Sequence, residues 1–398
     1  LLRPALAQAC RRIVGRPARH HNHHSGHRPH GPHPRHHRHH HHAPPNQHHY
    51  KPQFNANLLT PRSTATTTKP PQLHHDRLAN QNIINDRYLL ERTIGKGSYG
   101  KVKLAIDLND PQRMCRRALK FIAIDSVKKA AHVTRLRRET VLLRCLNHPH
   151  LVKLHDHFQT ADDLVLVLEH VNGQDLFDRI TKHPQQRLPE PEARAIFRQL
   201  VSALHYCHHH DVVHRDIKPE NVMLSEGGVV KLIDFGFANW FDQQAAGSRL
   251  ETNCGSPLYA APEIVKGVPY RGPETDCWSL GVVLVAMLTG SLPFEDDALK
   301  VLYEKICRGH YTLPKWVSAQ AADLIARMLV VDGGKRATIE EIGEHPWGRQ
   351  GFAGPPDPYI PVRRPLQVYD AQVLRAMAGD LNMDQQKIRY ELSMRPTT

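Results

Sequence analysis

The sequence predicts an α+β protein of two lobes, in which a small mixed β lobe with one main helix precedes a larger helical lobe. Short β-like stretches dominate over residues 87–168, interrupted by a basic helical stretch over 127–146. After Leu176 the apolar residues recur at helical spacing. The stretches with this spacing are 192–209, 278–289, 297–308 and 319–329.

Length and composition allow one large domain or two to three ordinary ones, since 398 residues with 40% hydrophobic content can bury a sizeable core. The net charge of +14 belongs to the start of the chain. Residues 1–75 contain eleven Lys and Arg and no Asp or Glu, which leaves 42 Lys and Arg against 39 Asp and Glu elsewhere. No aromatic residues interleave with these charges over 1–49, so we expect no specific nucleic-acid partner.

Residues 1–84 predict a disordered basic tail rich in His, Pro and Thr, because this composition cannot bury enough apolar surface to offset its ordering entropy. Residues 1–19 also have the composition of a mitochondrial transit peptide, but the same acid-free composition continues to Leu73 and favours the tail. The histidines over 20–49 could bind zinc, nickel or copper, although a pH-responsive, solvated tail explains them without a metal.

The seven cysteines are scattered and form no Cys-x-x-Cys arrangement, which indicates neither a disulfide framework nor a zinc site. A reducing compartment, the cytoplasm or the nucleus, fits this pattern. The longest strongly apolar run, 278–288, is shorter than the roughly 20 residues that cross a bilayer, so we expect no membrane span. The first residue is Leu rather than Met, which leaves a targeting signal open.

A glycine-rich segment, Gly-Lys-Gly-Ser-Tyr-Gly-Lys-Val over 95–102, predicts a phosphate-binding turn. Residues without a Cβ let backbone N–H groups come close to phosphate oxygens. Dinucleotide-binding enzymes share this glycine spacing but continue into a helix. Here residues 102–106 alternate like a strand, which disfavours that alternative.

Lys120 lies on the next predicted strand, from which we expect its side chain to project toward the phosphates. Most strand lysines are ordinary solvated residues. Glu139, on the helix that follows, offers an ion-pair partner that would hold Lys120 in place.

The most specific signal is His-Arg-Asp-Ile-Lys-Pro-Glu-Asn over 214–221. Asp216 can face a substrate hydroxyl while Asn221, five residues later, coordinates Mg²⁺. Asp234, in Asp-Phe-Gly, adds a carboxylate for Mg²⁺, which prefers oxygen ligands. Ala-Pro-Glu over 261–263 closes the segment, and matches in this order make chance a poor explanation.

With these motifs, residues 88–347 resemble a eukaryotic protein kinase domain, over about two-thirds of the chain. The resemblance implies the bilobal protein-kinase fold, over residues 85–347, and ATP-dependent phosphoryl transfer to proteins with Mg²⁺. Lys218 and Ser256 resemble the Ser/Thr-specific subclass. The segments 234–239 and 254–261, and Lys-Arg-Ala-Thr over 335–338, resemble the AMP-activated-kinase-related branch of the calmodulin-kinase group.

The resemblance also implies a set of site residues. The catalytic residues are Asp216, Lys218, Lys120 and Glu139, and the Mg²⁺ ligands are Asn221 and Asp234. The nucleotide and groove contacts are Gly95, Lys96, Gly97, Gly100, Val102, Ala118, Lys120, Glu169, Val171, Asp175, Glu220 and Met223. A hinge over 169–171 would bind adenine, with Leu168 before it as gatekeeper. Asp276 and an Arg336–Glu263 pair would act as internal anchors.

The resemblance further implies regulation and substrate preference. Thr252 would be the activation-loop phosphosite of an upstream kinase, with Arg215 as the partner of its phosphate. Asp175 and Glu220 would face the peptide groove and favour basic substrates. The alternative, a catalytically inactive pseudokinase scaffold, is disfavoured because no catalytic or metal-binding residue is missing.

The chain departs from the family pattern at two places. Arg117 occupies the position usually held by Val before Ala-x-Lys, at the end of a basic run. Residues 348–398 predict a linker and a partial ubiquitin-associated-like helical tail, with short amphipathic stretches within 371–392. Residues 380–383 replace the usual Gly-aromatic turn, and a generic helical tail fits equally well.

Overall fold

The computed structural model describes residues 82–97, 100–110, 115–124, 130–241, 249–252 and 254–361, with a few positions between 371 and 389. The predicted tail up to residue 81 and most of the possible ubiquitin-associated-like segment lie outside the described residues, and those predictions stay predictions. None of the described helices is both long and apolar enough to span a membrane.

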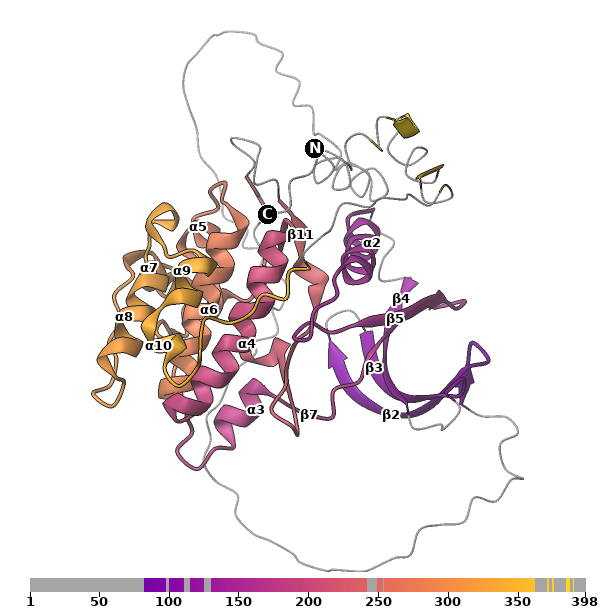
Figure 1. The fold of residues 1–398 in the computed structure, drawn as a ribbon, viewed down its shortest axis with the longest axis horizontal. Helices are drawn as coiled ribbons and strands as arrows, with labels where there is room; N and C mark the ends of the chain where they lie inside the picture. The colour runs from indigo at the N-terminus through magenta and orange to yellow at the C-terminus, as the bar shows by residue number, and fades with distance from the viewer. Residues whose placement is uncertain are drawn as a thin grey trace, which may run out of the picture. The chain divides into compact units, whose positions relative to one another are not determined.

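A curled antiparallel sheet forms the first lobe (Figure 1). Its described strands follow the spatial order β1-β2-β3-β4-β6-β5. Their bounds are β1 (Ile83–Ile84), β2 (Tyr88–Gly97), β3 (Gly100–Asp107), β4 (Arg116–Ala123), β5 (Leu154–Gln159) and β6 (Asp163–Glu169). Alternation along the strands buries Tyr88, Ala105, Leu119, Val165 and Val167 in a small core of this lobe.

Helix α2 (Ala130–Cys145) connects this lobe to the rest of the molecule. Its buried Leu142 and Leu143 belong to the same hydrophobic cluster as Phe235 of the second lobe. The predicted helical stretch over 127–146 is confirmed for Ala130–Cys145, while residues 127–129 lie outside the described residues. The helix lies where it can carry a polar side chain to the junction of the lobes.

The centre of the second lobe consists of α4 (Glu190–His209) and α6 (Gly272–Thr289), which pack against each other. Helix α6 is buried on almost every side. It begins six residues before the start at Trp278 that the apolar pattern predicts. Pro273 suits a first helical turn, and Asp276 is buried through hydrogen bonds rather than apolar contacts, so periodicity alone does not reveal this first part.

The remaining elements complete the helical lobe and its small strands. The helices are α3 (Leu176–Thr181), α5 (Pro262–Val265), α7 (Leu299–Arg308), α8 (Ala319–Met328), α9 (Ile339–Glu344) and α10 (Pro346–Arg349). The strands are β7 (Gly173–Asp175), β8 (Val212–Val213), β9 (Val222–Ser225), β10 (Val230–Leu232) and β11 (Asn239–Trp240). The helices predicted over 192–209, 297–308 and 319–329 are confirmed as α4, α7 and α8.

Residues that follow the last helix lie along α4. Arg194 donates to the Gln350 side chain at 2.6 Å, and the Arg198 guanidinium lies 3.9 Å from the centre of the Phe352 ring. The start of the predicted linker is therefore attached to the helical lobe.

A buried ion pair fixes the segment that precedes α6. The Arg336 side chain is completely buried, and its two terminal nitrogens lie 2.8 and 3.0 Å from the carboxylate oxygens of Glu263. Its guanidinium also lies 5.1 Å from the centre of the Trp278 ring. The predicted pair is confirmed, and it joins the loop before α9 to α5.

We expect Arg336→Ala to lower the free energy of unfolding by about 3–5 kcal/mol, because it leaves the Glu263 carboxylate without its buried partner. Urea unfolding followed by circular dichroism measures the change. The control is Arg327→Ala, which removes an exposed pair with Asp323 and should cost less than about 1 kcal/mol. Equal effects of the two substitutions would contradict a structural role for the buried pair.

Candidate active site

The Lys120 ammonium lies between two carboxylates at the junction of the lobes. Its Nζ is 2.8 Å from Glu139 Oε1, on α2, and 3.0 Å from Asp234 Oδ1, which follows β10. The predicted contact between Lys120 and Glu139 is confirmed. The second contact means that one cation joins the sheet, the helix and the segment that carries Asp234.

The charges of this cluster stabilise one another. Burial alone would lower the pKa of Lys120, but the carboxylates of Glu139 and Asp234 hold it above its ordinary value. Burial alone would raise the pKa of Asp234, but the Lys120 ammonium holds it below its ordinary value. Lys120 is therefore an ammonium and Asp234 a carboxylate at neutral pH.

The local backbone turns Asp234 toward Lys120. Asp234 has left-handed dihedral angles, φ 61° and ψ 79°, and its Oδ1 accepts from Gly236 N at 3.3 Å. Phe235 is completely buried against the ring of His214, with 4.9 Å between ring centres. A Cβ at Gly236 would lie 3.2 Å from Asp234 Oδ1, so a larger residue would crowd the carboxylate.

Asp216 is buried, and neighbouring side chains orient its carboxylate. Asn221 Nδ2 donates to Asp216 O at 2.8 Å and to Oδ2 at 2.9 Å, while Lys218 Nζ lies 2.8 Å from Oδ2. Ser256 donates to Oδ1 through both its N–H and its hydroxyl, each at 3.0 Å. The carboxylate is therefore oriented as an acceptor that can take a hydrogen bond from a hydroxyl group.

A buried carboxylate beneath this loop sets its backbone. Asp276 accepts from Arg215 N at 2.7 Å, from His214 N at 2.9 Å and from His208 Nε2 at 3.0 Å. Arg215 has a positive φ of 67°, which is uncommon for a residue with a Cβ. Asp276 therefore holds the residue before Asp216 in a conformation that the chain would otherwise avoid.

The predicted nucleotide contacts of the first lobe lie on neighbouring strands. Gly95 is opposite Val102 across β2 and β3, and Val102 is opposite Lys120 across β3 and β4. Ala118 is opposite Leu168, the residue before the predicted hinge. The structure therefore brings these positions together, while their roles stay predictions.

The turn between β2 and β3 explains one of its glycines. A Cβ at Gly100 would lie 1.7 Å from the carbonyl oxygen of Phe121, so only glycine fits there. Lys96 and Gly97 pair with the start of β3, and residues 98–99 between them and Gly100 lie outside the described part of the chain.

The predicted contacts of the second lobe lie next to the hinge. Glu169 ends β6, and Val171 follows it, half-buried. Met223 on β9 is opposite Asp175 on β7. Asp175 also caps α3 by accepting from Asp178 N at 2.7 Å, a structural task that the motif does not show.

Two acidic side chains predicted to face the peptide groove lie close to one another. Burial raises the pKa of Asp175, and it raises that of Glu220 with further contributions from Asp216 and Asp175. Within the described residues, neither carboxylate has an ion-pair partner. A cation placed between them would therefore be stabilised.

Sequence reasoning identified Arg215 beside the activation segment but missed its neighbours. Arg215 donates to the Tyr270 hydroxyl at 3.2 Å, and Tyr270 donates to the carbonyl oxygen of Thr252 at 2.9 Å. Burial lowers the pKa of Arg138, and the charges of Arg215 and Arg135 lower it further. Arg135 and Arg138 lie three residues apart on the predicted helix and therefore share a face, which was the one signal in the sequence for this arginine group.

Residues 88–348 match the family model of the protein kinase domain. This chain belongs to the protein kinase family. The predicted bilobal fold is thereby confirmed.

The relatives of this kinase domain point to one branch of the family. It is 41% identical over 307 residues to a carbon catabolite-derepressing protein kinase of Candida tropicalis, covering 76% of this chain and 48% of the relative. It is 46% identical over 260 residues to sucrose non-fermenting protein kinase 1 of Fusarium virguliforme, covering 65% and 36%.

A third relative, NUAK family SNF1-like kinase 2 of Pongo abelii, is 42% identical over 280 residues, covering 70% of this chain and 42% of the relative. These names confirm the resemblance to the AMP-activated-kinase-related branch. The chain spans about half or less of the length of the curated relatives it matches.

Proposed function

We propose that this chain is an Mg·ATP-dependent protein serine/threonine kinase, which transfers the γ-phosphoryl group of ATP to Ser or Thr hydroxyl groups of proteins. The observation that carries the proposal is the Lys120 ammonium between Glu139 and Asp234. In this arrangement the cation is fixed and charged, so it can hold the α- and β-phosphates of ATP.

Asp216 is proposed to orient the substrate hydroxyl and to accept its proton. Its buried carboxylate is held by Asn221 and already accepts from the Ser256 hydroxyl. Lys218, 2.8 Å from Asp216 Oδ2, would offset the negative charge that develops on the transferred group. Asp216 and Lys218 are then the groups next to the reacting atoms.

The donor set at Asn221 and Asp234 fits Mg²⁺. The Asn221 Nδ2 donates to Asp216 twice, which leaves its amide oxygen as a ligand, and Asp234 supplies a carboxylate. Mg²⁺ prefers hard oxygen ligands and is commonly held by one or two protein groups together with substrate phosphates. When bound, the ion would neutralise charge on the phosphates of ATP.

The second candidate function, a pseudokinase scaffold, is less well supported. A pseudokinase typically lacks the lysine, the catalytic Asp or the metal-binding Asp. Here Lys120, Asp216 and Asp234 are present and engaged in the contacts described above. A place in the cytoplasm or nucleus remains a prediction from the cysteine pattern.

For the substrate, we propose proteins with basic residues before the acceptor. The Asp175 and Glu220 carboxylates lie near one another without an ion-pair partner among the described residues. A guanidinium three residues before the acceptor would form charge-assisted hydrogen bonds with them. The groove would then select basic segments by charge.

For regulation, we propose that an upstream kinase phosphorylates Thr252. The added phosphate would bring roughly −1.5 to −2 charges and three acceptor oxygens. Arg138 and Arg215 are close enough to share one positive field, and Tyr270 joins Arg215 to the Thr252 backbone. Phosphate binding would connect the activation segment to α2 and to the loop of Asp216.

We expect Asp216→Asn to keep ATP binding and to lower the rate of peptide phosphorylation by about 10²-fold or more, since an amide cannot accept the proton. Assays of the purified chain measure its ATP binding and, with a Ser/Thr peptide library, its rate of peptide phosphorylation. The control is Glu226→Gln, at an exposed position that has no ion pair with any residue the structure describes. Near-normal turnover in Asp216→Asn would contradict the assignment of Asp216 as the proton acceptor.

The peptide library also tests substrate choice. We expect the preference for Arg three residues before the acceptor to fall by about fivefold or more in Glu220→Gln and in Asp175→Asn, from the loss of a charge-assisted hydrogen bond. Asn retains the ability to cap α3, which keeps the helix start intact. A library without basic preference, or one that these variants leave unchanged, would refute this part of the proposal.

Phosphorylation at Thr252 alone should raise turnover of one peptide substrate by about tenfold or more over the unphosphorylated protein and Thr252→Ala. Arg138→Gln should reduce this gain without preventing phosphorylation of Thr252, which mass spectrometry verifies. Equal activity of the three forms would mean that Thr252 is not a switch.

A further inference from the structure

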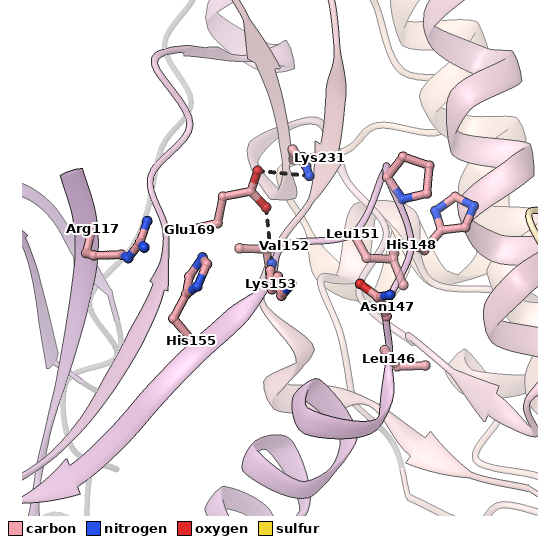
Figure 2. Close-up of a pocket in the computed structure, with 11 residues that line it drawn as sticks. Arg117, Leu146, Asn147, His148, Leu151, Val152, Lys153, His155, Glu169 and Lys231 are labelled. Carbon is pink, nitrogen blue, oxygen red and sulfur yellow. Dashed lines mark hydrogen bonds and ion pairs between the residues drawn. The ribbon is translucent and has the colours of Figure 1, made fainter. Parts of the chain in front are cut away.

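A cavity of about 370 Å³ lies on the hinge, beside the side chain of Glu169 (Figure 2). Its walls come from β4, β5, β10 and the loop between α2 and β5, so both lobes contribute. None of the residues predicted to contact the nucleotide lines it except Glu169. The cavity is therefore distinct from the proposed active site.

Three cationic side chains and one carboxylate line this cavity. Lys231 Nζ lies 2.9 Å from Glu169 Oε1, and the Lys153 backbone N donates to Oε2 at 3.3 Å (Figure 2). That pairing neutralises Lys231. Within the described residues, the Lys153 ammonium has no ion-pair partner. Arg117 is the third cation that lines the cavity.

Arg117 is a mostly buried cation of this cavity. Only 18% of its side chain is exposed, and its Nε is buried without a hydrogen-bond partner. Its nearest carboxylate, Asp107, lies 3.9 Å away and is already paired with Arg87 at 2.8 Å. Arg117 Nη1 donates to the Arg116 carbonyl oxygen at 3.5 Å, and in the described part of the chain its Nη2 has no hydrogen-bond partner. The outer edge of the guanidinium therefore offers a donor to an anion in the cavity.

Burial keeps the histidines of the cavity neutral. Burial lowers the pKa of His155, and the charges of Arg117 and Lys153 lower it further. Burial also lowers the pKa of His148 to about 3. These rings are therefore neutral at pH 7, so the cavity is lined by the cations Arg117, Lys153 and Lys231 and by the single carboxylate of Glu169.

Arg117 also explains a departure noted in the sequence. Proteins of the family that this chain resembles usually carry Val at this strand position. A Val side chain has no hydrogen-bond donor to bury. An ordinary solvated arginine would point its guanidinium into water, whereas this side chain is mostly covered. The substitution and the burial together indicate a ligand.

We propose that this cavity binds a small anion, a carboxylate or a phosphate group, through Arg117 and Lys153. The planar guanidinium suits either kind of oxygen pair. The ligand would lie beside the Glu169–Lys231 ion pair, which connects the hinge to the strand that leads into Asp234. Binding of the anion would therefore affect the hinge.

Ligand-observed NMR titration of the full chain with phenyl phosphate and with benzoate tests the site. The two probes share a ring and differ in the anionic group, so the tighter binder identifies the source of the anion. Saturating Mg²⁺ and a non-hydrolysable ATP analogue fill the nucleotide cleft, and ionic strength is held constant. We expect at least one probe to bind.

Variants locate the binding. We expect Arg117→Met to weaken it about tenfold or more and Lys153→Gln to weaken it by a smaller factor, from the loss of charge-assisted hydrogen bonds. Arg327→Gln, which removes a cation from an exposed pair with Asp323 on α8, is the matched control and should leave binding unchanged. Lys153 is exposed, so its variant should fold even if Arg117→Met does not.

Absence of binding by both probes would overturn the proposal. So would binding that Arg117→Met and Lys153→Gln both leave unchanged. The readout needs no phosphoryl transfer, so its failure is separate from a failure of the proposed kinase activity.

Discussion

The arrangement of the site depends on one cation, the Lys120 ammonium. It lies on a strand of the first lobe, yet its two partners come from α2 and from the segment after β10 of the second lobe. Because a buried ammonium is unfavourable without paired carboxylates, neither lobe can leave this contact without exposing or stranding a charge. The relative position of the lobes and the charge of Asp234 therefore follow from one cluster.

The second lobe holds its loops by the same physical means, buried polar groups joined by hydrogen bonds. Asp276 accepts three hydrogen bonds beneath the loop of Asp216, and Arg336 pairs with Glu263 at the end of the activation segment. Helix α6 carries Asp276 and is covered by apolar contacts, so a rigid core supports short loops that would otherwise vary. Rigid support of this kind suits chemistry that depends on positioning.

Much of the fold and of the site could be predicted because periodicity and motif spacing are local. The helices α4, α7 and α8 followed from periodicity and the Lys120–Glu139 contact from the motifs, whereas the Arg336–Glu263 pair followed from the resemblance to the kinase family. The rest depends on chain segments that meet only in three dimensions. Tyr270 reaches Thr252 across the activation segment, and no spacing in the sequence predicts that. The cavity beside Glu169 likewise needs four separate segments.

In the proposed kinase activity, Glu139 holds Lys120 in place for ATP. The most direct measurement is the kcat/KM for ATP of Glu139→Gln, compared with Glu192→Gln, which removes a partly exposed pair with Arg179. We expect a loss of about tenfold or more for Glu139→Gln, from a misplaced Lys120, and little change for Glu192→Gln. Thermal unfolding verifies that both variants are folded. Unchanged kcat/KM in a folded Glu139→Gln protein would contradict this role of Glu139.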